Sequence, residues 1–491
     1  MDVEVPRGPL AGEVARATHA GRAGVRIVAE RLGRTLAGGV EVLADVTLAI
    51  EPGELIGIVG GSGAGKTTLL EVLAGVTRPD RGVVTYDGVD LHAHLDGFRS
   101  VLGYVPQDDI IHTELPLART LAYAARLRLD PALGGAAVDA AVRNALDRLG
   151  LTPRADTRVA ALSGGQRKRA SIAAELLTRP AVFFLDEPTS GLDPVTGAEL
   201  LGVLRDLADT EATVVFTTHA VEDLARCDRV VFLAPGGRLR FVGTVAAACA
   251  HFGVAGIHDV YAALALPAEP AGGPTADRDA AAASAPAPAV ATRPQVRRQP
   301  GALRQWSVLT ARSFETMARN RLTLAILLGS PVMIIAMFLL LFQRGAFEPA
   351  DPDPTSILMI LFWVTFGAFF FGLTYGLLQI CTERPILRRE HLVGLRLGAY
   401  LLSKVAVLVP FLVAINVLML IVLRALDRLP AADATTYLSL GVTLTLDATA
   451  ALAIGLLASA AVRNPAQATL ALPMLCFPAV LFSGAILPVH V

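Results

Sequence analysis

Apolar and polar positions are distributed differently in the two halves of the chain. Up to about residue 266, charged and apolar residues are mixed as in a soluble α/β domain, whereas long uncharged runs begin at Leu322. Five such runs follow one another: Leu322–Phe342, Ile357–Ile380, Val405–Leu423, Tyr437–Val462 and Ala466–Val489. Because about 20 apolar residues in a helix cross a hydrocarbon core of about 30 Å, the runs predict five transmembrane spans. A single run would also fit a buried core helix, but five in succession favour an all-α polytopic membrane domain.

Two segments connect the halves. Residues 267–300 contain seven prolines and eleven alanines, which predicts a flexible, partly extended linker without a core of its own. Residues 303–321 place Leu303, Trp306 and Phe314 on one face at helical spacing. This pattern predicts an amphipathic helix at the membrane surface, with an ordinary packed helix as the alternative.

The charges of the loops predict the orientation in the membrane. If the N-terminal half is cytoplasmic, nine basic residues lie inside and three outside, in agreement with the positive-inside rule. Residues 1–25 suggest only a mobile leader, and no continuous apolar core of a signal peptide occurs before Leu36. We therefore expect a multi-pass protein of the plasma (cell inner) membrane, with residues 26–266 as a cytoplasmic domain.

The cytoplasmic half contains a phosphate-binding loop. Leu55–Val59 is a short apolar run suited to a buried parallel strand. The glycine-rich loop and the start of a helix follow directly, with the residues Gly60, Gly61, Ser62, Gly63, Ala64, Gly65, Lys66, Thr67 and Thr68. Such a loop lets backbone N–H groups converge on phosphate oxygens at a helix N-terminus. We expect Lys66 to reach the β- and γ-phosphates of a nucleoside triphosphate and Thr67 to ligate Mg²⁺.

A second apolar strand delivers two carboxylates. Ala181–Leu185 ends in Asp186 and Glu187. A carboxylate at the end of such a strand can hold Mg²⁺ beside the phosphate loop, which is the role expected of Asp186. Glu187 is then placed to act as the general base on the attacking water. On its own this pair is a weak signal, because acidic turns are common.

Composition and charge exclude several protein classes. The chain has 491 residues, of which 53% are hydrophobic and 18% charged, so it is not a disordered chain. A net charge of −1 gives no support for nucleic-acid binding. The four cysteines are far apart in the sequence and suggest neither a disulfide framework nor a zinc site. Lysine is rare, with Lys66, Lys168 and Lys404 among 43 basic residues.

Further motifs resemble those of ABC ATPases. Leu162–Gln166 is similar to their signature, Ser190–Asp193 to their D-loop, His219 to their switch histidine and Gln107 to their Q-loop glutamine. The resemblance implies an α/β P-loop domain that works as a pair and holds ATP between the phosphate loop of one chain and the signature of the other. The residues then expected to bind ATP across the pair include Ser163, Gly164, Gly165, Gln166 and Asp193.

The resemblance also implies roles for the remaining motif residues. His219 would contact the γ-phosphate, and Gln107 would touch Mg²⁺ and the water while sensing the membrane domain. Lys168 and Arg169 are expected to be surface or interface charges. Members of the family usually stack adenine on an aromatic residue before the phosphate loop, but no aromatic residue occurs here before Tyr86. An aliphatic side chain such as Leu36 or Val40, a histidine or the partner chain would then contact the base.

The order of the two halves resembles the G subfamily of ABC exporters, the White-like half-transporters, and their bacterial relatives. Arg304–Ser313 resembles their connecting helix, Glu383–Glu390 their cytoplasmic helix that docks on the ATPase, and Phe482–Pro488 the end of their fifth span. The alternative to a docking helix is that the basic residues of segment 383–396 only orient the chain in the membrane by the positive-inside rule. The family has six spans, so we expect the five-span sequence to be truncated.

Asp447 is an ionisable residue near the middle of the fourth run. Such a group costs at least about 2.5–3.5 kcal/mol on insertion scales and usually faces the interior of a bundle. It either contributes to a transport path or the dimer seam, or is a protonated carboxyl bonded to a neighbouring helix. Tyr375, Gln379 and Asn416 are weaker candidates of the same kind.

Two functions follow from these observations. The first is a half-transporter that dimerises with itself or a similar chain, hydrolyses ATP with Mg²⁺, and exports a lipid-like or hydrophobic substrate. The second is a membrane-anchored ABC ATPase with a regulatory or signalling role. Membrane lipids are expected partners in either case, and nucleic acid is not.

Overall fold

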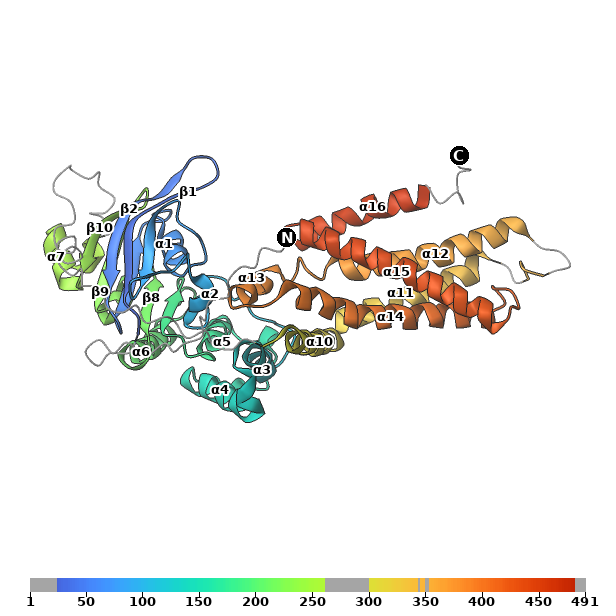
Figure 1. Ribbon diagram of the computed structural model, residues 1–491, viewed down its shortest axis with the longest axis horizontal. Helices are drawn as coiled ribbons and strands as arrows, with labels where there is room; N and C mark the ends of the chain where they lie inside the picture. Colours follow the sequence, from blue (N-terminus) through green and yellow to red (C-terminus); the bar gives the residue numbers. More distant parts are fainter. Residues whose placement is uncertain (1–23, 261–299, 343–344, 349–352, 482–491) are drawn as a thin grey trace, which may run out of the picture. The chain divides into compact units, whose positions relative to one another are not determined.

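The computed structural model describes residues 24–260, 300–342, 345–348 and 353–481. Two compact units divide the chain close to residue 300 (Figure 1). The leader 1–25 and the linker 267–300 fall almost wholly outside the described residues, as does the end of the fifth apolar run with Phe482–Pro488.

In the described part of the N-terminal unit, two sheets carry the fold. A six-stranded sheet has the order β10-β9-β3-β8-β7-β6, and a four-stranded antiparallel sheet has the order β2-β1-β4-β5. The strands are β1 Ile27–Thr35, β2 Glu41–Ile50, β3 Leu55–Gly60, β4 Arg81–Tyr86, β5 Val89–Asp90, β6 Leu102–Val105, β7 Val182–Leu185, β8 Thr213–Thr217, β9 Arg229–Ala234 and β10 Arg238–Gly243. This confirms the α/β fold expected for the N-terminal domain.

The parallel strands of the larger sheet are buried on both faces. Every residue of β3, β7 and β8 is buried, which explains why these strands are near-continuous apolar runs rather than alternating ones. Helices surround them: α1 Lys66–Leu73, α2 Leu95–Phe98, α3 Leu117–Arg128, α4 Gly134–Arg148, α5 Gly164–Leu176, α6 Pro194–Thr210 and α7 Val245–Phe252, with short 3₁₀ turns η1 Pro131–Leu133, η2 Thr152–Arg154, η3 Val159–Ala161 and η4 Val221–Arg226.

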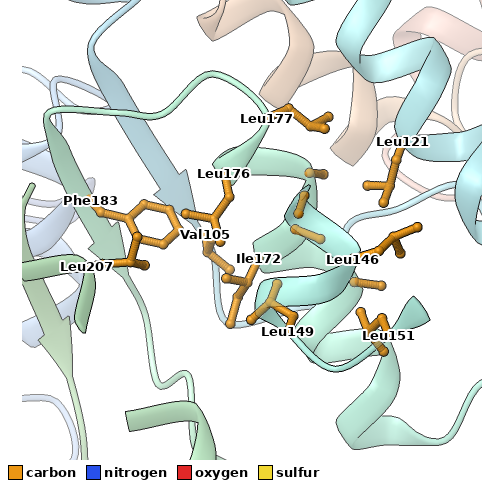
Figure 2. Close-up of a cluster of buried hydrophobic side chains, with 14 of the residues drawn as sticks. Val105, Leu121, Leu146, Leu149, Leu151, Ile172, Leu176, Leu177, Phe183 and Leu207 are labelled. Atoms are coloured by element: carbon orange, nitrogen blue, oxygen red, sulfur yellow. The ribbon is translucent and has the colours of Figure 1, made fainter. Parts of the chain in front are cut away.

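Helix α5 joins this sheet to a group of helices. Figure 2 shows Ile172 and Leu176 of α5 between Phe183 on one side and Leu146 of α4 on the other. All four side chains are at most 7% exposed. The first turn of α5, which carries the signature, is thus attached to a helix that is held by the core.

The C-terminal unit is helical, as expected. Its helices are α10 Ala302–Arg319, α11 Arg321–Leu341, α12 Pro354–Leu377, α13 Arg384–Leu392, α14 Leu397–Ala425, α15 Ala434–Ala461 and α16 Pro465–Leu481. Among the described residues, three helices are long and apolar enough to cross a membrane, namely α12, α14 and α15. The first and fifth expected spans correspond to shorter apolar helices, Leu327–Leu341 and Pro465–Leu481. The five-span topology therefore stays a prediction.

The buried face of helix α10 contains polar as well as apolar residues. Gln305, Leu309 and Arg312 are buried, whereas Leu303 and Phe314 are 81% and 59% exposed. The guanidinium of Arg312 forms a buried ion pair with Glu390 of α13. Exposed apolar residues such as Leu303 and Phe314 are what a helix at the membrane surface needs, and the membrane-surface placement of α10 stays a prediction.

Glycines allow α12 and α15 to pack closely. A Cβ on Gly372 would lie 2.0 Å from the carbonyl oxygen of Ala448, and one on Gly455 would lie 2.5 Å from that of Leu373. Helices in lipid associate by close van der Waals packing of this kind. These two helices run side by side with α11 and α14 in Figure 1.

We expect Gly455→Ala to destabilise the membrane unit, because the new methyl group meets the backbone of α12. Overpacking of this kind typically costs about 1–3 kcal/mol, which should lower the midpoint of thermal unfolding measured in detergent micelles. Gly441→Ala on the same helix is the control, since its Cβ would meet Leu420 at an ordinary 3.8 Å. Equal midpoints for the two variants would contradict the close packing.

Candidate active site

The phosphate loop lies between β3 and α1, as the sequence predicts. Gly63 and Gly65 adopt positive φ angles of 74° and 88°. A Cβ on Gly65 would lie 2.3 Å from the carbonyl oxygen of Val42, so only glycine fits there. The loop packs closely at Gly65, where α1 starts. At Gly61 and Gly63 it borders open space, since a Cβ on either residue would meet no atom within 4 Å.

Lys66 is the first residue of α1 and is 7% exposed. Its ammonium donates to the carbonyl oxygens of Gly60 at 3.0 Å and Gly61 at 3.1 Å. Burial lowers the pKa of Lys66 below its usual value, and the nearby carboxylates of Glu187 and Asp186 oppose that shift. A cation held at the mouth of the loop in this way suits the binding of phosphate oxygens.

Asp186 and two threonine hydroxyls form a compact oxygen cluster. Thr67 Oγ1 donates to Asp186 Oδ1 at 3.2 Å, and Thr217 Oγ1 of β8 donates to the same oxygen. One hydroxyl and one carboxylate beside a phosphate loop fit Mg²⁺, which is usually held by one or two carboxylates together with substrate phosphates. The described residues include no cluster of three or more His, Cys, Asp and Glu side chains that could hold a metal ion.

Glu187 is held between two residues that the sequence assigned to the reaction. Gln107 Nε2 donates to Glu187 Oε2 at 3.0 Å, and His219 Nε2 lies 2.6 Å from Glu187 Oε1. The backbone of Glu187 has a positive φ of 49°, which is uncommon outside glycine. Its N–H donates to Thr217 Oγ1 at 2.9 Å. These contacts hold a carboxylate whose charge, with that of Asp186, acts on Lys66, and its role as a general base stays a prediction.

The signature residues are not part of this cluster. Ser163 is the N-cap of α5, and its Oγ and Gln166 Oε1 each accept a hydrogen bond from the other residue's backbone. Within the described residues, no hydrogen bond joins the signature residues Ser163 to Gln166 to the phosphate loop. Asp193 likewise caps α6, where its side chain accepts from the backbone of Thr196. The structure thus separates the two motifs that the resemblance assigns to one nucleotide.

Sequence reasoning missed two buried polar residues. Asp223 is 7% exposed and accepts hydrogen bonds from Thr189 and Thr218, both at 2.6 Å, and so ties the segment after Glu187 to the segment before His219. No local motif marks that residue. Lys168 was expected to be a surface or interface charge, and the surface alternative is wrong, because Lys168 is 4% exposed.

The two aliphatic candidates for base contact lie on the turn between β1 and β2. Leu36 and Val40 are 49% and 60% exposed, and the turn is closed by a hydrogen bond from Leu36 N to Val40 O. Val40 is two residues before Val42, whose carbonyl lies against Gly65 of the phosphate loop. At about 3.3 Å per strand residue, Val40 is within about 7 Å of that point.

We expect Val40→Tyr to bind Mg-ATP more tightly if the base packs on this turn. Stacking of a base on an aromatic ring is worth about 1–3 kcal/mol, so Kd should fall about fivefold or more. Titration against a fluorescent ATP analogue measures the change. Leu133→Tyr in η1 is the control, because it introduces the same side chain at a different exposed aliphatic residue. If both variants keep the wild-type Kd, the base contact lies elsewhere.

Comparison with known proteins matches each unit to a protein family. A family model described as ABC transporter matches residues 43–190, and one described as ABC-2 type transporter matches residues 304–491. The chain is 34% identical over 477 residues to the ABC transporter ATP-binding/permease protein Rv1747 of Mycobacterium tuberculosis, covering 93% of this chain and 53% of that protein. It thus spans about half the length of this relative.

Two other relatives match shorter stretches of the chain. The broad substrate specificity ATP-binding cassette transporter ABCG2 of Mus musculus is 34% identical over 44% of this chain and 34% of that protein. The energy-coupling factor transporter ATP-binding protein EcfA2 of Symbiobacterium thermophilum is 36% identical over 42% of this chain and 72% of that protein. The chain belongs to the ABC transporter family, with an ABC ATPase domain followed by an ABC-2 type membrane domain.

Proposed function

We propose that this chain is one half of an ATP-driven exporter that works as a homodimer or with a similar half. The observation that carries the proposal is the separation of the signature from the phosphate loop. Ser163 and its neighbours form an exposed helix start, with an open N-terminal dipole but no bond to Lys66, Asp186 or Glu187 within the described residues. A second chain would bring its own signature helix to this phosphate loop.

Each residue of the cluster has a distinct task in hydrolysis. Lys66 would bind the β- and γ-phosphates, and Thr67 with Asp186 would hold Mg²⁺, which would neutralise phosphate charge. Glu187 would accept the proton of the attacking water, His219 would contact the γ-phosphate, and Gln107 would orient Glu187 through their hydrogen bond. Groups held in place by the protein in this way need little reorganisation during a reaction.

The ATP-dependent closing of two chains would drive the membrane units. The nucleotide-bound and hydrolysed states differ in their preference for the closed pair, because only the triphosphate has a γ-phosphate to share between them. We place the ATPase in the cytoplasm and the helices in the plasma membrane. A lipid-like or hydrophobic cargo suits the apolar helices α12, α14 and α15.

Polar residues within these helices separate into two groups. Asn416 is fully buried and donates to Leu444 O of α15 at 3.3 Å, and Tyr375 donates to Leu327 O of α11 at 3.1 Å, so both hold helices together. Asp447 on α15 is half-buried, and its Oδ2 has no hydrogen-bond partner among the described residues. An ionisable group in an apolar helix of this kind favours a role on the transport path over membrane anchoring alone. The alternative function is a membrane-anchored regulatory ATPase.

We expect Glu187→Gln to abolish steady-state ATP hydrolysis while the chain still binds ATP, because the amide cannot accept the proton of water. Loss of the base should reduce kcat by about 10²–10⁴-fold. Phosphate release and size-exclusion chromatography with ATP would show an inactive, ATP-bound dimer. Glu222→Gln on η4 makes the same chemical change at an exposed site and should behave as wild type. Full activity in Glu187→Gln would refute the assignment.

We expect Asp447→Asn to lower ATP-dependent transport of a fluorescent lipid analogue in proteoliposomes, with the Kd for ATP unchanged. The substitution removes an ionisable group from the membrane helices and leaves the ATPase domain unaltered. Asp427→Asn in the loop after α14 is the matched control. Unchanged transport and unchanged ATPase activity would leave Asp447 with a packing role only. Absence of any cargo that stimulates ATP turnover would favour the regulatory alternative.

A further inference from the structure

The three lysines of this chain share an unusual setting. Among 43 basic residues, only Lys66, Lys168 and Lys404 are lysine, and they are 7%, 4% and 3% exposed. An ammonium is a compact donor that can approach several acceptors at one point, whereas guanidinium needs a wider planar arrangement. Lysine is therefore present at buried positions where a compact cation bonds specific acceptors.

Lys168 bonds the loop that carries Gln107. It lies on α5, two residues after the signature, and its Nζ donates to Gln107 O at 2.7 Å and to Pro106 O at 3.4 Å. Burial lowers the pKa of Lys168 below its usual value, and the carboxylate of Asp109 is the main opposing influence. Charge-assisted bonds to backbone carbonyls are stronger than neutral ones, so this side chain ties the loop to the signature helix.

We propose that Lys168 is a positioning residue for the general base. The ammonium of Lys168 fixes the backbone of Gln107, and the side chain of Gln107 donates to Glu187 at 3.0 Å. A tilt of α5 would move Gln107 and so change how Glu187 is held. The inference rests on the proposed ATPase function and adds to it a link between the signature helix and the base of the same chain.

The core makes this role separable from folding. Ile172 and Leu176 pack α5 against Phe183 and neighbouring apolar side chains (Figure 2). Among the described residues, Lys168 forms hydrogen bonds to the loop after β6 and to no other segment. Loss of the ammonium should therefore loosen that loop while α5 and the sheet stay in place.

The first test measures the loop without hydrolysis. In the full-length chain in detergent, Lys168→Met should speed amide hydrogen exchange in residues 106–111 and leave exchange in β7 and the second half of α5 unchanged. Arg169→Met is the matched control, because its guanidinium donates to Leu149 O and not to the Gln107 loop. Unchanged exchange in residues 106–111, or faster exchange throughout the N-terminal unit, would overturn the proposal whether or not the chain hydrolyses ATP.

The second test asks whether Lys168 acts through Gln107. Lys168→Met should reduce kcat for ATP hydrolysis about tenfold, which is part of the contribution of a general base, with Kd for Mg-ATP within about twofold of wild type. In a Gln107→Ala background the same substitution should have little further effect, because both act through one path. Full additivity of the two losses, or an unchanged kcat, would overturn the proposal. A wild-type chain without ATP hydrolysis would instead contradict the proposed function, and the exchange measurement would still decide the role of Lys168.

Discussion

Parallel pairing of β3, β8 and β7 is the constraint on which the site depends. The register pairs Ile58 with Thr217 and Phe216 with Leu185, so the strands end together at one edge of the sheet. The phosphate loop follows β3, and Asp186 follows β7. Ligands of open α/β sheets bind outside the carboxyl ends of the strands. The strand pairing alone therefore brings together residues more than 100 positions apart, such as Thr67 and Asp186.

A polar network then sets the position of Glu187 within that edge. Its left-handed backbone is a conformation that costs of order 1–3 kcal/mol in a non-glycine residue and persists only when its surroundings enforce it. Thr217 holds its N–H, while Gln107 and His219 hold its two carboxylate oxygens. A carboxylate held from several sides would need little reorganisation if it acts as the proposed base.

Ion pairs and close helix packing play the corresponding part in the membrane unit. Lys404 of α14 lies 2.8 Å from Glu383, which also accepts a hydrogen bond from Tyr400 at 2.9 Å. Buried pairs contribute little net stability but penalise other arrangements strongly, because a partner left alone keeps an uncompensated charge. The bonds therefore fix the residue that precedes α13 relative to α14 more than they stabilise the fold.

Elements with local signals could be predicted from the order of residues alone: the phosphate loop between strand and helix, Asp186 and Glu187 after an apolar strand, and the apolar helices of the C-terminal unit. The burial of individual polar side chains depends on the folded arrangement. Lys168 is buried because the Gln107 loop covers it, α10 turns Arg312 inward because Glu390 lies opposite, and Asp223 is positioned by two threonines from separate loops. These outcomes depend on contacts between distant segments, and the spacing of residues along one chain carries no record of such contacts.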